Sequence, residues 1–282
     1  MKSKRHARTN RRKSPGGFIT LRSALLAFAV TFGVASTALT GCSPTTKAPA
    51  APVQATPAPA AAGAQFSACR QHFPGGSPPA VAAAEPAALC FDAFAVLYSG
   101  RSKTPVYVVE RLTAASVAAA QGIPRSDRFY EEARLPSRWR ATLDHYRNSG
   151  YDRGHTAPAG DMPNATAKAQ SFSLANMVPQ HPTLNQKAWN QAEQATRKYA
   201  ARAGGDVYVY TGPSFGTATP PTIGAGKVWV PAATWKVVYV PSEQRSWAYW
   251  MSNDDGPHSL KPIDYRAFVA RGGPDLLANV AH

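Results

Sequence analysis

The 282-residue chain has few cysteines and few acidic residues. It contains 3 Cys, and 16 Asp and Glu face 31 Lys and Arg, which gives a formal net charge of +15. Its charged fraction of 17% and hydrophobic fraction of 44% are those of a globular protein, which excludes disorder along the whole chain. The sequence shows no internal repeat. The length suffices for one sizeable domain with appendages.

The N-terminus has the composition of an export signal. Residues 1–22 are basic, residues 24–40 form one apolar run, and Leu39-Thr40-Gly41-Cys42 follows. This order is typical of a secretory signal, and the tetrapeptide resembles a bacterial lipobox with Cys42 as the lipidated residue. We therefore predict a lipoprotein signal peptide over 1–41 and an exported, membrane-anchored protein facing the periplasm or the cell exterior. An ordinary secretory signal and an uncleaved anchor are the alternatives, the run being at the short limit for a spanning helix.

Residues 42–65 are rich in proline and alanine and contain few side chains that could build a core. Such a segment is typical of an extended, semi-rigid tether. We predict that it holds one folded domain, residues 66–282, away from the membrane surface.

The three cysteines lack the C-x₂-C spacing of a zinc site, and the nearby His72 is isolated. With Cys42 lipidated, Cys69 and Cys90 remain as an even pair in an oxidising compartment, which predicts a disulfide between them. Two buried free thiols are the alternative, because the sequence does not give their separation.

Eight of the basic residues lie in the first 41 residues, which contain no acid, and subtracting them from +15 leaves +7 for the rest. A basic surface suits a polyanionic partner, because phosphates attract Lys and Arg and release counterions on binding. Charge alone does not separate this interpretation from a protein that is merely soluble.

Short apolar runs rich in aromatic and β-branched residues predict strands. Residues 91–98 and 105–112 predict a hairpin, and four later strands are expected at 206–211, 227–230, 235–240 and 247–251. Residues 114–120 are interpreted as a surface turn or loop and residues 125–140 as irregular.

The best predicted helix spans 185–203, where good helix formers run without Pro or Gly until Gly204-Gly205. Strands, then a long helix, then more strands without regular βαβ alternation favour an α+β fold. We expect a mixed, mainly antiparallel central sheet with helices.

The stretch from Asp152 to Arg197 carries the residue types that phosphodiester hydrolysis needs. His155 can act as a general base, and Arg153 can hold phosphate oxygens with its fork of donors. Mg²⁺ prefers oxygen ligands and keeps several waters, so the Asn185 carbonyl and a nearby carboxylate would suffice. Asn185, Trp189, Glu193 and Arg197 recur every four residues and so share one helix face, with Trp189 interpreted as a packing residue.

Each residue also has a simpler structural interpretation. His155 could be structural, Asn185 a helix N-cap, and Asp152 a turn former. Glu193 and Arg197 could form a surface pair worth a few tenths of a kcal/mol. Composition and spacing alone therefore leave a nuclease site as one hypothesis among several.

The sequence YDRGHTAPAGDM (151–162) followed by SFSLANMVPQHPTLNQKAWNQAEQATR (171–197) resembles the DNA/RNA non-specific endonucleases. A DRGH motif, an F-x-L-x-N-x-x-P-Q segment and an N-x-x-x-W-x-x-x-E segment are all present and in order. The resemblance covers roughly residues 88–270. Thr156 and Ala175 depart from the commoner residues at their positions, and neither change removes a catalytic group.

The resemblance implies a fold with a ββα-metal finger at the active site. It makes His155 the general base, Asn185 the direct ligand of Mg²⁺, with Mn²⁺ as an alternative ion, and Glu193 the acid that holds metal-bound water. The remaining implied residues are Gln180, which acts through water, the supporting Asn176, the phosphate-contacting Arg153 and Arg197, the geometry-setting Asp152, and an upstream arginine, Arg125 in preference to Arg128.

The resemblance implies an endonuclease that cuts DNA and RNA without sequence preference. The main alternative is a non-catalytic, nucleic-acid-binding surface lipoprotein, which would not need His155, Asn185 and Glu193. A hydrolase of a different phosphodiester is a third hypothesis. The sequence leaves the oligomeric state open, a homodimer included.

Overall fold

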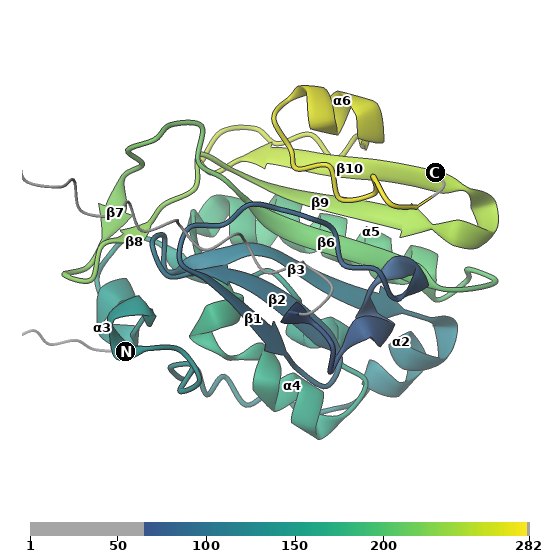
Figure 1. Ribbon diagram of the computed structural model, residues 1–282, viewed down its shortest axis with the longest axis horizontal. Coiled ribbons are helices and arrows are strands. Elements are labelled where there is room, and N and C mark those ends of the chain that lie inside the picture. Colours follow the sequence, from purple (N-terminus) through teal and green to yellow (C-terminus); the bar gives the residue numbers. More distant parts are fainter. Residues whose placement is uncertain (1–64, 281–282) are drawn as a thin grey trace, which may run out of the picture. The chain divides into compact units, whose positions relative to one another are not determined.

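A computed structural model describes residues 65–280. The predicted signal peptide, Cys42 and all of the predicted tether except its last residue lie outside the described residues. The centre of the fold is a seven-stranded sheet in the order β1-β2-β3-β6-β9-β10-β11, and all its pairings are antiparallel (Figure 1). Its strands are β1 (Pro86–Cys90), β2 (Phe94–Ser99), β3 (Thr104–Leu112), β6 (Val207–Ser214), β9 (Ala233–Val240), β10 (Arg245–Ser252) and β11 (Ile263–Asp264).

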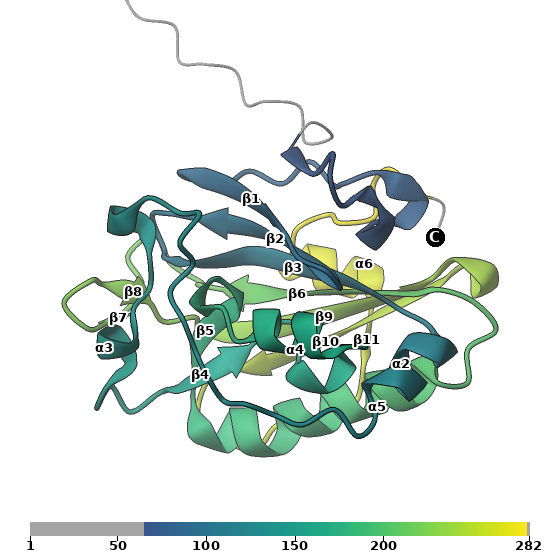
Figure 2. The ribbon, with the colours of Figure 1, turned by 90° about the horizontal axis from the view of Figure 1, so that it is seen from below.

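Helices cover both faces of this sheet (Figure 2). One face carries α6 (Tyr265–Ala270) and the segment that precedes β1. The other face carries α2 (Ala114–Ala120), α4 (Ala165–Ser171) and α5 (Asn190–Ala200). The predicted α+β fold with a mainly antiparallel sheet is therefore confirmed.

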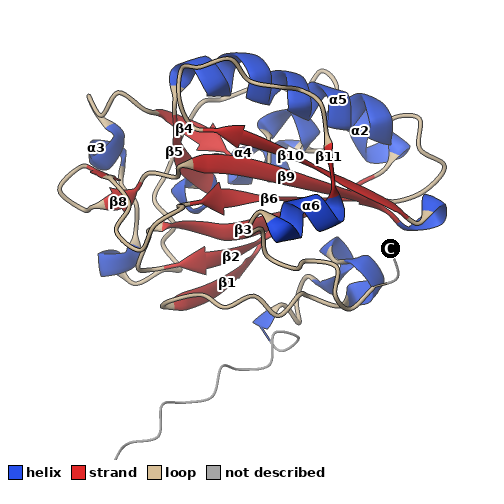
Figure 3. Ribbon diagram, turned by 90° about the horizontal axis from the view of Figure 1, so that it is seen from above, coloured by secondary structure: helices blue, strands red, loops and turns tan. Residues whose placement is uncertain are grey.

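Two small sheets and one short helix complete the fold (Figure 3). The strands β4 (Asp152–His155) and β5 (Met177–Gln180) pair with each other, and β7 (Thr222–Ile223) pairs with β8 (Val228–Trp229). The helix α3 (Leu143–Tyr146) precedes β4. Among residues 65–280, no helix has the length and apolar character needed to cross a membrane.

The face under α6 is packed with aromatic side chains. Tyr107, Tyr210, Trp235 and Phe268 are all at most 1% exposed and belong to one cluster. The segment before β1 adds Phe66 to the same cluster and is fixed to the end of β1 by a Cys69–Cys90 disulfide with a Cα–Cα distance of 5.7 Å.

The expectation of a surface turn at 114–120 is wrong, because these residues form α2. The Thr113 hydroxyl accepts a hydrogen bond from the backbone N–H of Ser116, and the Ser116 hydroxyl accepts one from the backbone N–H of Thr113. This capping box starts the helix, and the burial of Val117 and Ala120 gives it an inner face. The alanine-rich composition concealed that amphipathic pattern.

The other predicted elements are recovered with shifted ends. The hairpin of β2 and β3 is confirmed, as are the strands β6, β8, β9 and β10. The long helix is confirmed in α5, but it begins with a π-helical segment, η6 (Leu184–Trp189). The edge strand β1, which is only half-buried, was not predicted.

Candidate active site

The DRGH segment and the N-x-x-x-W-x-x-x-E segment meet at one cavity of about 430 Å³ on the face of the sheet that α5 covers. Strand β4 carries DRGH and pairs with β5, and the chain then enters η6 and α5, which completes a ββα unit. The cavity is lined by Arg125, Arg153, His155, Pro158, Ala159, Gly160, Asn185, Gln186, Asn190, Glu193 and Arg197. The predicted helix face of Asn185, Glu193 and Arg197 therefore opens onto His155, and Trp189 is buried, as expected of a packing residue.

Asn185 is oriented by Asp152. Its Nδ2 donates to Asp152 Oδ2 at 2.8 Å, and Gln186 Nε2 donates to the same oxygen at 2.9 Å. Because the amide nitrogen is engaged in this way, the side-chain carbonyl of Asn185 is left to accept a ligand in the cavity. Asn185 lies inside η6, so its function is not that of a helix N-cap.

His155 is packed between two phenylalanine rings. Its ring centroid lies 5.8 Å from that of Phe129 and 5.1 Å from that of Phe172, and its Nε2 is buried without a hydrogen-bond partner. Burial, together with the positive charges of Arg125 and Arg153, lowers the pKa of His155 to about 3. The imidazole is therefore neutral at neutral pH.

The same two rings also contact two of the three arginines of the cavity. The guanidinium of Arg153 lies 4.2 Å from the Phe129 centroid, and that of Arg125 lies 5.1 Å from the Phe172 centroid. These are cation–π distances. Arg125 rather than Arg128 lines the cavity, which agrees with the preferred choice of upstream arginine.

Arg197 is fixed by a residue that the sequence did not single out, Asp161. Its Nε forms an ion pair with Asp161 Oδ1 at 2.5 Å, and the Asp161 side chain is only 2% exposed. A Cβ added at Gly160 would lie 2.6 Å from Arg197 Nη2, so glycine leaves the room that the guanidinium occupies. The only sequence signal for Asp161 is its place at the end of APAGD, where an acid also suits a loop.

Beneath the cavity lies a group of buried charges on the central strands. Glu110 on β3 and Lys236 on β9 are each 1% exposed, and Lys236 Nζ donates to Thr211 Oγ1 at 2.7 Å. Burial and the neighbouring Asp161 raise the pKa of Glu110 well above its usual range. Burial also raises the pKa of Glu193 to about 7, although Lys236 and Arg197 oppose this shift.

Asn176 and Gln180 do not line the cavity. Asn176 Oδ1 accepts hydrogen bonds from Thr156 Oγ1 at 2.6 Å and from the Ala157 N–H at 2.9 Å. These bonds fix the position of the residues that follow His155. Gln180 is fully buried, its Nε2 lies 3.4 Å from Thr234 Oγ1, and a Cβ at Gly154 would overlap it. The structure thus gives Asn176 a supporting position, but it does not bring Gln180 to the cavity where a water-mediated metal contact was expected.

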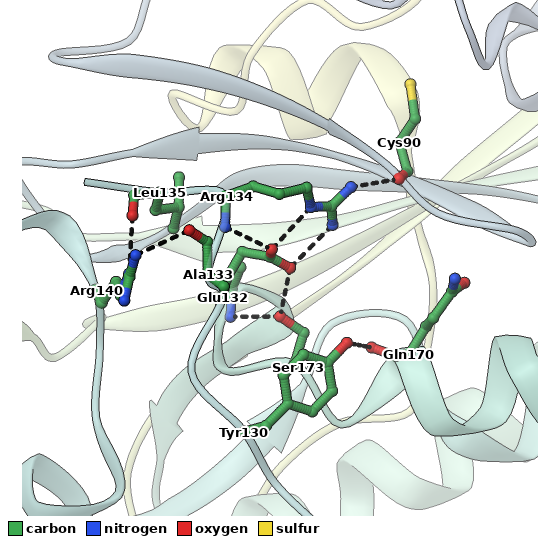
Figure 4. A network of polar contacts seen from close by, with 10 residues as sticks. Cys90, Tyr130, Glu132, Ala133, Arg134, Leu135, Arg140, Gln170 and Ser173 are labelled. Atoms are coloured by element: carbon green, nitrogen blue, oxygen red, sulfur yellow. Dashed lines mark hydrogen bonds and ion pairs between the residues drawn. The ribbon is translucent and has the colours of Figure 1, made fainter. Parts of the chain in front are cut away.

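The segment that carries Arg125 and Phe129 is anchored by the hydrogen bonds of Glu132, which follows them in the sequence (Figure 4). Arg134 donates to both Glu132 oxygens, at 2.7 and 2.9 Å, and Ser173 donates to one of them at 3.2 Å. Burial would raise the pKa of Glu132, but the hydrogen bonds from Arg134 outweigh it and hold the pKa below its usual range. Arg134 also donates to the Cys90 carbonyl at 2.8 Å, so the segment is joined to β1.

The donor set fits a divalent cation that prefers oxygen. The free carbonyl of Asn185 and the carboxyl group of Glu193 line one cavity, and both offer oxygen atoms of the kind that such a cation binds. Within residues 65–280 no three His, Cys, Asp or Glu side chains cluster as a metal site, so Asn185 and water would carry most of the coordination.

Comparisons with known proteins give the family. The model of the DNA/RNA non-specific endonucleases matches residues 79–271. The chain is 35% identical over 173 residues to nuclease C1 of Cunninghamella echinulata var. echinulata, an alignment that covers 56% of this chain and 67% of that protein. It is 36% identical over 140 residues to human mitochondrial endonuclease G, covering 49% and 46% of the two chains.

The fold agrees with these matches. The crystal structure of an EndoG/EndoGI complex, described as showing the mechanism of EndoG inhibition, aligns with a TM-score of 0.61 at 29% identity. The alignment covers 77% of this chain and 90% of that one. The chain therefore belongs to the DNA/RNA non-specific endonuclease family, and the predicted enzyme class is confirmed. It spans about half the length of several of its relatives, 52% of a Nostoc nuclease among them.

Proposed function

We propose that the protein is a metal-dependent endonuclease that hydrolyses phosphodiester bonds of DNA and RNA without sequence preference. The observation that carries the proposal is the single cavity in which His155, the Asp152-oriented Asn185 and three arginines converge. A protein that only bound nucleic acid would need the arginines but not a neutral imidazole or an oriented amide carbonyl. This is why the non-catalytic lipoprotein is the weaker candidate.

Asn185 would hold Mg²⁺ or Mn²⁺ directly, and Glu193 would hold water bound to the ion. When bound, the ion supplies positive charge that polarises the phosphoryl oxygen and stabilises the charge that develops on the leaving oxygen. A cation beside Glu193 would also favour its ionised form, which reverses the effect of burial on its pKa. Asp152 keeps the Asn185 carbonyl turned toward the cavity through its hydrogen bond to Nδ2.

His155 would take a proton from the attacking water. Its Nε2 is buried, which leaves Nδ1 as the nitrogen that can accept this proton. The charges of Arg125 and Arg153 are part of what lowers the pKa of His155. A phosphate bound between these arginines would neutralise them and raise the pKa back toward the range where imidazole is an effective base.

Arg125, Arg153 and Arg197 would hold the phosphate. Two of them are braced by phenylalanine rings and the third by Asp161, so their orientation is set before substrate arrives. Pre-set donors of this kind lose little side-chain entropy on binding. Contacts to phosphate carry no sequence information, which suits cleavage of both polymers.

The test is hydrolysis of plasmid DNA and of RNA by the purified protein, with Mg²⁺ and with chelator, beside a His155→Ala variant. We expect metal-dependent loss of both polymers, strongly reduced by the substitution. Salt-sensitive binding of both polymers without cleavage by the wild type would overturn the proposal and favour the binding lipoprotein.

Export and anchoring through a lipidated Cys42 form a separate part of the proposal. They rest on the basic start, the apolar run and the LTGC tetrapeptide. Mass spectrometry of membrane fractions should find a lipidated N-terminal peptide that a Cys42→Ser variant lacks. A soluble exported chain cleaved at another residue would instead support an ordinary secretory signal.

A further inference from the structure

A second cavity of about 370 Å³ adjoins the candidate active site. It is lined by Leu143, Tyr146, Arg147, Tyr151, Asp152 and Arg153. Arg153 lines both cavities, and the Asp152 carboxylate that borders this one accepts from Asn185 and Gln186 of the other. A nucleic acid bound at the phosphate-binding arginines that continues on this side therefore extends over Arg153 into the second cavity.

The lining combines cations with apolar and aromatic surface. Arg147 and Arg153 offer guanidinium groups, while Leu143 and Tyr151 offer apolar surface. Leu143 is 41% exposed and is one of three large hydrophobic side chains exposed among residues 65–280. Arg147 is held only by a solvent-exposed ion pair with Asp144, which contributes little and can be exchanged for a phosphate.

Tyr146 forms a rigid part of this lining. It is 5% exposed and packs in the core with Leu174, Met177 and Val228. Its hydroxyl is itself buried and so does not reach a ligand in the cavity.

We propose that this cavity binds the nucleotide next to the scissile phosphodiester, with its base against Leu143 and Tyr151 and its phosphate toward Arg147 and Arg153. The inference rests on the proposed function. The volume lies within the roughly 300–1,000 Å³ of pockets for small ligands. Asp152 repels a second anion, but its two amide hydrogen bonds already offset part of its charge. Stacking on apolar and aromatic side chains accepts any base, so the subsite gives affinity without sequence preference.

The first experiment compares Leu143→Ala with Leu260→Ala, a control at a leucine that is also 41% exposed. The substrates are a short single-stranded oligonucleotide and bis(p-nitrophenyl) phosphate, which has a phosphodiester but no flanking nucleoside. Leu143→Ala should raise KM for the oligonucleotide about fivefold or more, because the base loses apolar contact with the leucine side chain, with hydrolysis of the small ester unchanged. Leu260→Ala should change neither reaction.

Equal behaviour of the two leucine variants on the oligonucleotide would overturn the subsite. An equal loss on both substrates with Leu143→Ala would also overturn it, since the residue would then act on the catalytic centre rather than on the neighbouring nucleotide.

The second experiment measures binding of the same fluorescently labelled oligonucleotide in chelator, where no cleavage is needed. Arg147→Ala should lower the salt dependence of log K by about 0.7 for each phosphate that the variant no longer neutralises. Arg245→Ala is the matched control, because Arg245 is also an exposed, acid-paired arginine and lines neither cavity. If the wild-type protein binds the oligonucleotide through Leu143 and Arg147 but never cleaves it, the proposed function is refuted while the subsite is supported.

Discussion

The two faces of the central strands differ sharply although they come from alternate residues of the same chain segments. On β6 and β9, Tyr210 and Trp235 enter the aromatic cluster under α6, while their neighbours Thr211 and Lys236 lie on the opposite face, where Lys236 interacts electrostatically with Glu193. On β3, Val109 belongs to the aromatic cluster and Glu110 belongs to the buried charges. The period of two along a strand is what separates these environments.

The two faces of this one sheet therefore have different roles. Burial of the aromatic side chains contributes stability, roughly in proportion to the apolar area removed from water. Buried charges contribute little net stability, because desolvation offsets their attraction, but removing one partner leaves the others uncompensated. We therefore infer that the buried charges on this face serve the arginine and the carboxylates of the site rather than the stability of the fold.

The largest expected effect is the loss of activity on substitution of His155, which lies on the charged side of the sheet. His155→Ala should lower kcat by about 10²–10⁴, the contribution of a general base, with the fold unchanged because its Nε2 has no hydrogen-bond partner to lose. Turnover of plasmid and RNA and the circular dichroism spectrum measure the two properties. His258→Ala, a remote histidine, is the control, and equal activities of the two variants would contradict the assignment.

Neighbouring residues on β9 offer a direct test of the two faces. Trp235→Ala should cost about 3–5 kcal/mol of unfolding free energy through its cavity. Lys236→Met should cost a similar amount, about 3–5 kcal/mol, by leaving buried carboxylates uncompensated. Denaturant unfolding measures both.

Activity should separate these two variants. Measured where both are folded, kcat should be kept in Trp235→Ala and lowered in Lys236→Met, since Lys236 interacts electrostatically with Glu193. A loss of kcat confined to Trp235→Ala would break the division between the faces.

Asp161 should matter for activity through Arg197. Asp161→Asn keeps the shape but removes the charged hydrogen bond, which is worth about 1.5–3 kcal/mol, so we expect kcat/KM to fall about 10- to 100-fold. Asp206→Asn, which breaks the half-exposed pair with Arg111, is the control and should leave kcat/KM unchanged. Full activity of Asp161→Asn would refute the positioning role of Asp161.

The smallest effect is a pH dependence of stability. The pKa of His155 is about 3 when folded against 6.5 as the usual value, so the unfolded chain binds more protons between these pH values. Stability is therefore lost as pH falls below 6.5, by about 2 kcal/mol between pH 7.5 and pH 5 from this residue. His155→Gln removes this loss, so the difference in unfolding free energy between variant and wild type should change with pH. Parallel curves would show that His155 is not buried neutral.

The sequence determined the family and most of the central sheet. DRGH and the N-x-x-x-W-x-x-x-E segment carry enough local order to predict Asn185, Trp189 and Glu193 on one helix face, because helical spacing is a local property. The strands β3, β6 and β9 were found from apolar, β-branched runs, since those runs are buried on at least one face.

Only the tertiary structure decided which side chains support the site. Asp161 meets Arg197 across 36 residues of sequence, and Lys236 lies beneath a cavity whose lining comes from other segments. Gln180 occupies a motif position, yet its side chain is buried against Gly154 and does not line the cavity. Local patterns fix backbone periodicity, whereas contacts between distant segments depend on how the sheet and α5 pack, and this packing decides which charges share a buried space.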